Sequence, residues 1–447
     1  MCGVVCCERA ASRQLAIPET EPPRVTARLH AASAPVVPEP VARPPVQLDR
    51  DGDDDEASAG DAGAPLSEGQ FERVGRAPLA LQRICDLTPF GDALYAAHAT
   101  RPLGSDGATI TRYRPGDARP FSVAFDWNRA GEPSKGGGAG QGFLRVHAIG
   151  ERLFVTDADP PYNGFGISEP GTEGFVFVST NQGEFAKARM PGHLPPRPPD
   201  AQGKAGALVL PRAYHVIDAI RFRGHLYAAT GAVPPGERAW RGASPAALLV
   251  EGELGDRFGY AADYPRPYQS GVWRFTFLVR FRDRLYAGLQ DYDQREPNDY
   301  VYFALPRERN ALAQEDLHAV RATEAGTAQT LRWYADGGHL YWIAANREGV
   351  ALRVTSDGDT WRIVRLPGDV GVPTDIVRYR GALHVLTSRA LLRLDDSGPA
   401  VLARLVEKHS PFELDDLFCA APLAVFQGAL YAGGQRDGAL YRFRERE

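Results

Sequence analysis

The chain has 447 residues, a formal net charge of −5 and a hydrophobic fraction of 43%. That apolar content is enough for a sizeable core, and no stretch approaches the roughly 18 consecutive apolar residues of a membrane-spanning helix. The charge is small and no Lys/Arg-rich block occurs, so nucleic acid is excluded as an expected partner. These numbers predict a globular protein without a transmembrane segment.

Residues 1–69 differ in composition from the rest of the chain. Residues 17–46 are dominated by Pro, Ala and Val, and residues 49–65 read DRDGDDDEASAGDAGAP. A segment this charged and poor in aromatic residues cannot form a core, so we predict a disordered tail over residues 1–69 and a folded domain over residues 70–447. The acidic run fails as an EF-hand loop, because the positions that need Gly and Glu carry Asp54 and Gly60.

The N-terminal sequence MCGVVCC does not determine the cellular location of the protein. Cys2, Cys6 and Cys7 are candidates for lipidation or remnants of a mis-assigned start, and the segment lacks the charged and apolar regions of a signal peptide. An acidic, proline-rich tether ahead of a folded domain is typical of exported or surface-anchored bacterial proteins. We therefore expect an extracytoplasmic or surface-tethered location.

One short pattern recurs seven times after residue 85: an aromatic residue or isoleucine, a polar or glycine turn, and a Leu-Tyr-Ala-like strand. The copies are PFGDALYAA (Phe90), AIGERLFVT (Ile149), RFRGHLYAA (Phe222), RFRDRLYAG (Phe281), WYADGGHLYWI (Tyr334), RYRGALHVL (Tyr379) and VFQGALYAG (Phe426). Each copy predicts a β-hairpin, and repeated hairpins cannot bury their faces unless they stack. Successive copies lie 43 to 73 residues apart, close to the roughly 40–50 residues of a propeller blade plus insertions.

The pattern therefore predicts an all-β fold, a seven-bladed β-propeller. The last copy leaves room for only about three strands before the chain ends. We expect the segment around Phe71 to Arg76 to supply the missing outer strand and so close the ring, which removes free sheet edges.

Ring closure makes the first and last copies neighbours, and each carries a cysteine. Cys85 lies in the first strand of the first copy, and Cys419 lies just before the first strand of the last copy. A disulfide is compatible with that placement, but two buried free thiols are the commoner outcome and are favoured here.

Two segments resemble the Asp-box turns of sialidase-type propellers. RVTSDGDTWRIV (Arg353 to Val364) carries Asp357 and Trp361, and FVFVSTNQGEF (Phe175 to Phe185) has Asn181 and Phe185 at the corresponding places. In such a turn the Asp or Asn accepts backbone N–H bonds and the aromatic residue plugs the blade. The resemblance implies a structural motif and leaves function open.

The resemblance to sialidases extends to the first blade. Gln82-Arg83-Ile84-Cys85 followed by Leu94-Tyr95-Ala96-Ala97 is similar to the sialidase opening, which implies that Arg83 binds a substrate carboxylate. The aromatic residue and the proline of that opening are missing here, and sialidases have six blades. Further arginines for such a site are Arg145, Arg274 and Arg332.

Charged residues recur at one level of the predicted inner strands. Four positions before the aromatic residue or isoleucine, the copies carry Asp86, Arg145, Asp218, Phe277, Thr330, Asp375 and Pro422. We interpret the first three as a ring of ion pairs, with a binding role as the alternative. His147 and His215 lie near them and are the candidates for proton transfer if the site is catalytic.

Two Asp-x-Asp pairs follow equivalent strands of the second and fourth copies. Asp157 with Asp159, and Asp291 with Asp293, could bind Ca²⁺, although ordinary solvated loops explain them better. No other cofactor is expected.

These observations favour a non-enzymatic binding scaffold, with the ends where first strands begin and second strands finish as the binding face. The expected top-face residues are Arg83, Asp86, Arg145, His147, His215, Asp218, Arg274, Arg332 and Asp375. The expected ligand is a glycan, peptide or protein, and we expect a monomer. The alternative is a sialidase-like hydrolase or lyase that acts on an anionic glycan at the channel mouth.

Overall fold

The fold is described from a computed structural model. It describes residues 64–79, 81–99, 108–126, 142–157, 174–179, 183–185, 206–210, 214–231, 247–251, 258–263, 273–291, 298–321, 328–395, 397–405 and 409–446. All of the described residues belong to one unit of the chain, Leu48–Glu447, which we call the second unit. Residues 1–63 of the predicted tail lie outside the described residues, and residues 64–69 are described.

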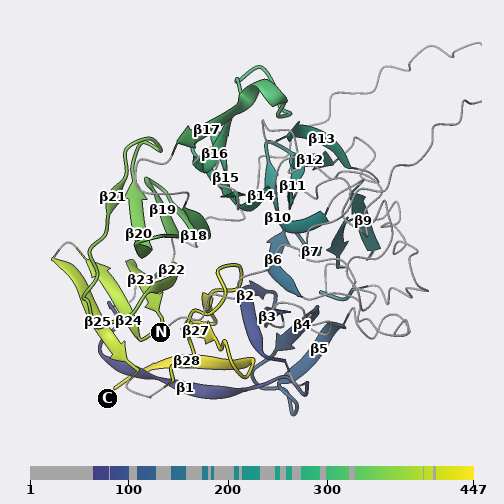
Figure 1. Cartoon of the computed structure of the whole chain (residues 1–447). Coiled ribbons are helices and arrows are strands. Elements are labelled where there is room, and N and C mark those ends of the chain that lie inside the picture. The colour runs from purple at the N-terminus through teal and green to yellow at the C-terminus, as the bar shows by residue number, and fades with distance from the viewer. Residues whose placement is uncertain are drawn as a thin grey trace, which may run out of the picture. The chain divides into compact units, whose positions relative to one another are not determined.

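The second unit is a β-propeller whose sheets surround a central channel (Figure 1). Each repeat copy supplies the two inner strands of a four-stranded antiparallel meander, which we call repeat units one to seven. The innermost strands are β2 (Arg83–Phe90), β6 (Phe143–Ile149), β10 (Tyr214–Phe222), β14 (Trp273–Phe281), β18 (Gln329–Asp336), β22 (Pro373–Tyr379) and β26 (Leu423–Phe426). The second strands are β3 (Ala93–Ala99), β7 (Arg152–Asp157), β11 (His225–Gly231), β15 (Arg284–Asp291), β19 (His339–Asn346), β23 (Ala382–Thr387) and β27 (Ala429–Gly433).

The outer strands complete each unit. The third strands are β4 (Thr109–Tyr113), β8 (Gly174–Val178), β12 (Ala247–Glu251), β16 (Asn298–Ala304), β20 (Gly349–Thr355), β24 (Ala390–Asp395) and β28 (Ala439–Glu445). The fourth strands are β5 (Phe121–Asp126), β9 (Gly206–Leu210), β13 (Phe258–Asp263), β17 (Leu317–Arg321), β21 (Arg362–Ile363), β25 (Gly398–Arg404) and β1 (Gly69–Arg76). One 3-10 turn, Gln314–Asp316, precedes β17.

Counted by sheets, the propeller has six blades and not the predicted seven. Five sheets have four strands, and one has eight. The larger sheet contains units three and four, because Gly231 at the end of β11 pairs with Arg274 at the start of β14. The prediction of seven separate blades was therefore wrong, although each repeat copy does form its hairpin.

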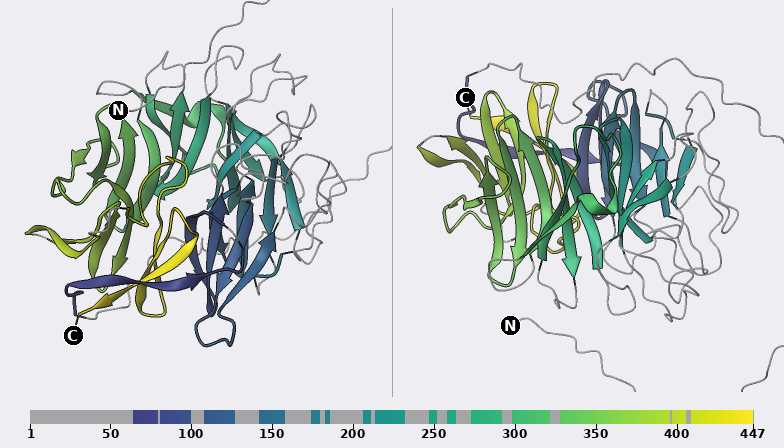
Figure 2. Two further views of the ribbon diagram at one scale, coloured as in Figure 1. Left: turned by 60° about the horizontal axis from the view of Figure 1, so that its bottom comes forward. Right: turned by 90° about the horizontal axis from the view of Figure 1, so that it is seen from above.

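The ring closes with a strand from the N-terminal side, as predicted. β1 pairs antiparallel with β28 from Gly69↔Glu445 to Arg76↔Ala439. Figure 2 shows this purple strand beside the yellow C-terminal strand. Phe71 packs edge-to-face on Phe412 and Phe443, with ring centroids 5.0 and 5.8 Å apart. Leu66, just before β1, is also buried in the core cluster of this sheet.

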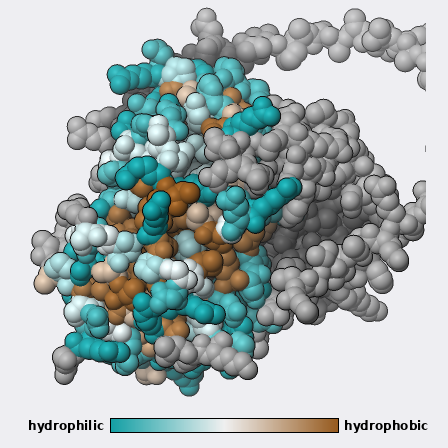
Figure 3. Space-filling view, turned by 60° about the vertical axis from the view of Figure 1, so that its left-hand side comes forward, coloured by the Kyte–Doolittle hydropathy of each residue, from teal (hydrophilic) through white to brown (hydrophobic). Residues whose placement is uncertain are grey.

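The core lies between neighbouring units. Ile220 and Phe222 of β10 pack with Leu278 of β14, and Ile84 and Leu87 of β2 pack with residues of β26 and β27. The hairpin turns need left-handed backbone, so Arg380–Gly381 has φ values of 46° and 73°. On the side that carries β21 and β25, hydrophobic atoms form patches interrupted by hydrophilic ones (Figure 3). None of the described segments forms a helix with the length and hydropathy needed to cross a bilayer.

A tight turn held by side-chain hydrogen bonds follows β20, within the first of the two segments that resemble Asp-boxes. Asp357 Oδ1 accepts the backbone N–H groups of Asp359 and Thr360 at 2.8 and 2.7 Å. These bonds hold the pKa of Asp357 below its usual range. Trp361 donates its indole N–H to the Tyr300 hydroxyl at 2.8 Å and packs among the aromatic residues of units four and five. In the second segment Phe185 stacks on Phe125, while Asn181 lies outside the described residues.

Candidate functional site

A layer of charged residues crosses the channel at one level of the innermost strands. The residues at this level lie four positions before the last pair of each hairpin. Five of them are charged and form the charged layer, namely Asp86, Arg145, Asp218, Arg332 and Asp375, and the other two are Phe277 and Pro422. The sequence alignment placed Thr330 at this level in the fifth copy. That assignment was wrong, because the hairpin of unit five extends two residues further, to Asp336↔His339, and Arg332 takes the position.

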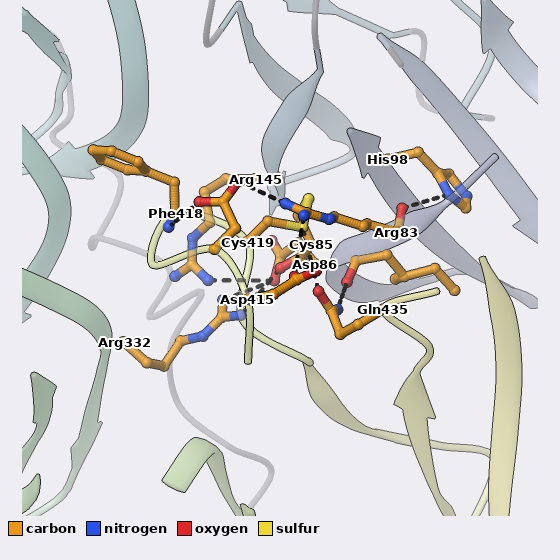
Figure 4. Close-up of a disulfide and its surroundings, with 12 residues drawn as sticks. Arg83, Cys85, Asp86, His98, Arg145, Arg332, Asp415, Phe418, Cys419 and Gln435 are labelled. Atoms are coloured by element: carbon orange, nitrogen blue, oxygen red, sulfur yellow. Dashed lines mark hydrogen bonds and ion pairs between the residues drawn. A yellow bond between two sulfur atoms is a disulfide. The ribbon is translucent and has the colours of Figure 1, made fainter. Parts of the chain in front are cut away.

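The charges of this layer are paired between neighbouring units and across the channel. Arg145 Nη1 lies 3.3 Å from Asp86 Oδ1, and Arg145 Nε lies 3.9 Å from Asp218 Oδ2. Arg332, which comes from unit five, lies 3.1 Å from the same Asp86 oxygen and 3.3 Å from Asp375 Oδ1. Figure 4 shows Arg145 and Arg332 converging on Asp86. The predicted ion pairs among Asp86, Arg145 and Asp218 are therefore present.

The three aspartates also join neighbouring units through the backbone. Asp86 accepts the N–H of Val146 at 3.0 Å, Asp218 that of Leu278 at 2.8 Å, and Asp375 that of Leu423 at 2.7 Å. Innermost strands present a free edge to the channel, so their N–H groups need acceptors from elsewhere. Each aspartate meets this need for the following unit, which explains an acid on an inner strand without invoking a ligand.

Irregular backbone geometry orients the side chains of the charged layer. The hairpins that begin with β2, β6, β10, β14, β18 and β22 each have a register shift at or just before this level. A β-bulge bends its strand and re-aims the side chain beside it. The charged layer therefore coincides with a bulge that is repeated around the ring.

Burial changes the proton affinity of two groups here. Burial raises the pKa of Asp375 to about 7, against the opposing effect of its backbone hydrogen bonds to Leu423 and Ile376. For His147, burial opposes protonation, but the Asp218 carboxylate overcomes it and raises the pKa. His147 Nε2 lies 2.5 Å from Asp218 Oδ1.

A loop between β25 and β26 crosses one end of the channel, and a disulfide fixes it. Cys419 of this crossing loop (residues 409–421) is bonded to Cys85 of β2 (Figure 4). The favoured prediction of two free thiols was therefore wrong. Arg83, only 2% exposed, pairs with Asp415 and Asp416 of the loop at 3.0 and 2.6 Å. Sequence alone could not decide whether Cys85 and Cys419 pair, because the course of the loop depends on tertiary contacts.

On the other side of the charged layer lies a cavity of about 910 Å³. In each innermost strand its lining begins at or after the charged layer and continues towards the hairpin turns, as far as Gly381 and Gly428. In the part of the chain that the structure describes, the lining includes His147, one carboxylate, that of Asp86, and five arginines. The arginines are Arg145, Arg221, Arg280, Arg378 and Arg380. The volume is within the roughly 300–1,000 Å³ typical of small-molecule sites.

The predicted site residues thus divide into three groups. Asp86, Arg145, His147, Asp218, Arg332 and Asp375 come together in or beside the charged layer. Arg83 holds the crossing loop, and Arg274 contacts Gln290 and the ring of Phe418 from the same loop. His215 belongs to β10, but its side chain lies outside the described part of the chain.

The predicted calcium ligands are largely outside the described residues. Asp159 and Asp293 are not described, and only the strand backbone is described for Asp157 and Asp291. Within the described ranges, no group of three or more His, Cys, Asp or Glu side chains could hold a metal ion. The calcium site stays a prediction.

Sequence reasoning missed the cavity arginines of the hairpin ends. Arg221, Arg280 and Arg378 directly precede the aromatic residue of their copies, in the strings RF, RF and RY. That recurrence was visible in the sequence, but only the register shows that the three residues share one level of the channel.

Comparison with known proteins supports the fold. No protein-family model matches the chain, and no curated protein matches it. Among solved structures, virginiamycin B lyase from Staphylococcus aureus is similar with a TM-score of 0.50 and 8% identity, over 85% of this chain and all of that one. Prolyl oligopeptidase B from Galerina marginata has a TM-score of 0.47 and 12% identity, over 83% of this chain and 52% of that one.

An extracellular protein is also among the similar structures. The extracellular domain of a hybrid two-component system from B. thetaiotaomicron has a TM-score of 0.48 and 9% identity, over 85% of this chain and 40% of that one. At such identities a likeness concerns the fold alone. These proteins have varied functions, so the function of this chain has to be argued from its own site.

Proposed function

We propose that this protein is a non-enzymatic binding scaffold that takes a small ligand into the channel cavity from the end where the hairpin turns lie. The observation that carries the proposal is the cavity of about 910 Å³, which is lined by innermost strands of all seven repeat units. The charged layer forms its inner end. Because the buried ion pairs there already satisfy one another, they serve as a rigid floor and not as the reactive groups.

The walls suit a polar ligand with a flat or apolar face. Tyr334, which is half-buried, contributes to the lining together with the arginines, and the largely buried Trp333 and Tyr379 lie at its edge. Aromatic faces and guanidinium groups are the usual contacts of sugars and other polar small molecules with oxyanion groups. An acidic glycan fragment or a comparable small anion is therefore the proposed ligand class, and protein partners on the outer surface are not needed.

A thermal-shift and calorimetric screen of acidic and neutral sugars tests the proposal. A ligand at a hundredfold excess over its dissociation constant stabilises the folded state by about 2.7 kcal/mol. The variant Ala335→Trp fills part of the cavity wall and should abolish the shift, whereas Ile363→Trp, at a 56% exposed residue of β21, should retain it. Equal shifts in both variants would place the ligand elsewhere and refute the proposal.

The second candidate is the anionic-glycan hydrolase or lyase. The specific observation in its favour is that His147 lines the cavity and contacts Asp218, as a general base with an orienting carboxylate would. Breakdown of the bound sugar, lost in His147→Gln with retained binding, would establish it. Binding without breakdown would favour the scaffold.

We also propose an extracytoplasmic location. The Cys85–Cys419 disulfide is the supporting observation, since such bonds persist in oxidising compartments. Thiol trapping of the protein in intact cells tests this, because a reduced pair in the native host would contradict it.

A further inference from the structure

Three arginines occupy one equivalent position around the cavity. Arg221, Arg280 and Arg378 each directly precede the last paired residue of their innermost strand and lie opposite Leu226, Leu285 and Leu383 in the second strand. All three line the cavity. Because the fold repeats, their surroundings can be compared position by position.

At Arg378 a neighbouring carboxylate and a turn carbonyl neutralise and hold the positively charged side chain. Its Nη1 donates to the carbonyl of Gly381 in its own hairpin turn at 2.7 Å. Its Nε donates to Asp336 Oδ1 at 2.9 Å, and its Nη2 contacts the other oxygen of the same carboxylate. Asp336 is the last paired residue of β18, so the counter-ion comes from the preceding unit.

Arg221 has the same turn contact but a different neighbour. Its Nη1 donates to the carbonyl of Gly224 at 3.0 Å, as Arg378 does to Gly381. The residue of the preceding unit that corresponds to Asp336 is Ile149, the last paired residue of β6. Within the described part of the chain, no carboxylate pairs with Arg221.

We propose that Arg221 binds an oxyanion group of the ligand, a carboxylate or a sulfate or phosphate ester, at the place that a protein carboxylate occupies beside Arg378. This inference rests on the proposed function and names the chemistry of the ligand. The Nε and Nη2 edge of Arg378 binds both oxygens of Asp336, and that fork geometry matches planar oxyanions. In Arg221 the turn carbonyl orients the guanidinium in the same way.

The surroundings of Arg221 strengthen the assignment. Arg280 holds the equivalent position in the next unit. Among the described lining residues the one carboxylate is that of Asp86, which lies in the charged layer and is paired with Arg145 and Arg332. The turn end of the cavity therefore carries arginines on neighbouring units, and Arg221 is the one proposed to meet an entering anion.

Isothermal titration of the full chain tests the inference with glucuronate, glucose and inorganic sulfate as probes. We expect wild-type protein to bind glucuronate more tightly than glucose, with sulfate in competition. Arg221→Gln should weaken glucuronate binding about 10- to 100-fold, the effect of losing a hydrogen bond to a charged group. Arg404→Gln, in an exposed pair on the outer strand β25, is the matched control and should bind as wild type.

A second pair of variants tests the effect of a protein carboxylate beside Arg221, in the place that Asp336 takes beside Arg378. Ile149→Asp places a carboxylate at the position of Asp336, and Ile149→Asn has the same shape without the charge. The Asp variant should bind glucuronate at least about tenfold more weakly than the Asn variant. Circular dichroism confirms that both fold, and Arg221→Gln decides the question if they do not.

The outcomes separate this inference from the proposed function. Equal glucuronate affinity in Arg221→Gln and wild type, or equal affinity of wild type for glucuronate and glucose, overturns the inference and leaves the binding scaffold intact. Failure of wild type to bind any of the three probes overturns both.

Discussion

At the scale of single residues, Asp86 is the centre of the charged layer. It accepts the N–H of Val146 and pairs with Arg145 and Arg332, and it is 7% exposed. Removing one partner of a buried ion pair leaves an uncompensated charge, which typically costs about 3–5 kcal/mol. We therefore expect Asp86→Asn to lower the free energy of unfolding by about that amount in urea denaturation.

The matched control is Asp359→Asn. Asp359 pairs with Arg284 but is 58% exposed, and such surface pairs contribute about 0–1 kcal/mol. Similar losses in the two variants would contradict the role assigned to the layer.

A second residue-scale prediction concerns pH. Burial lowers the pKa of His98 to about 4, and that of His384 likewise. Unfolded histidine titrates near 6.5, so the unfolded state takes up protons first as the pH falls. The contribution of His98 to stability should therefore be lost between about pH 6.5 and pH 4, by up to about 3 kcal/mol. Asp375, whose pKa is raised to about 7, contributes in the opposite direction over the same range, so the His98 contribution is read as the difference between wild type and variant. In His98→Gln this pH dependence should be weaker, as measured by unfolding at each pH; an unchanged dependence would show that His98 is not buried as described.

The sequence predicted the residues of the charged layer correctly where their place within a repeat copy was enough to identify them. Counting back from the aromatic residue found Asp86, Arg145, Asp218 and Asp375. It failed in the fifth copy, because the turn there begins after Asp336 and not after Tyr334. The contrast between Arg221 and Arg378 could not be predicted, since it depends on which residue of the preceding unit lies opposite.

At the scale of elements, β1 closes the ring. A chain that begins at Ala77 would lack this strand and expose the edge of β28 together with the ring of Phe443. Exposed edges pair with other chains. We expect this variant to self-associate in light scattering and to unfold at a lower temperature, whereas a chain that begins at residue 64 should stay monomeric. A monomeric variant with unchanged unfolding temperature would contradict closure by β1.

The crossing loop is the second element whose role can be measured. The Cys85–Cys419 disulfide joins residues 334 positions apart, and a native disulfide typically contributes about 2–4 kcal/mol. Replacing both cysteines by serine should reduce the free energy of unfolding by that amount. The control, with Cys2, Cys6 and Cys7 replaced, should not change. Because Arg83 still pairs with Asp415 and Asp416, we expect the double variant to fold and to bind ligand.

Element-level prediction from sequence was accurate for local pairing and less so for long-range pairing. The hairpins and the closing strand followed from pattern and chain length. The fusion of units three and four rests on the single pair Gly231↔Arg274, and no local signal specifies such a contact. The disulfide was underestimated for the same reason, since the crossing loop approaches β2 only through the closed ring.

At the scale of the whole molecule, ring formation creates the binding site. Each unit contributes the free edge of one innermost strand, and the charged layer and the crossing loop close one end of the channel. The sequence placed the site residues at that end, whereas the cavity extends away from the layer towards the hairpin turns. Composition and repeats predicted the ring, but the direction of the cavity depends on the loop that occupies the other end.

The most direct test of the account is to locate an oxyanion in the channel. Crystals of the full chain soaked in selenate would give an anomalous signal wherever the anion binds. We expect a peak inside the cavity within hydrogen-bonding distance of the Arg221 guanidinium, and we expect its loss in crystals of Arg221→Gln. Selenate peaks confined to the outer surface, with an empty channel in wild-type crystals, would contradict it.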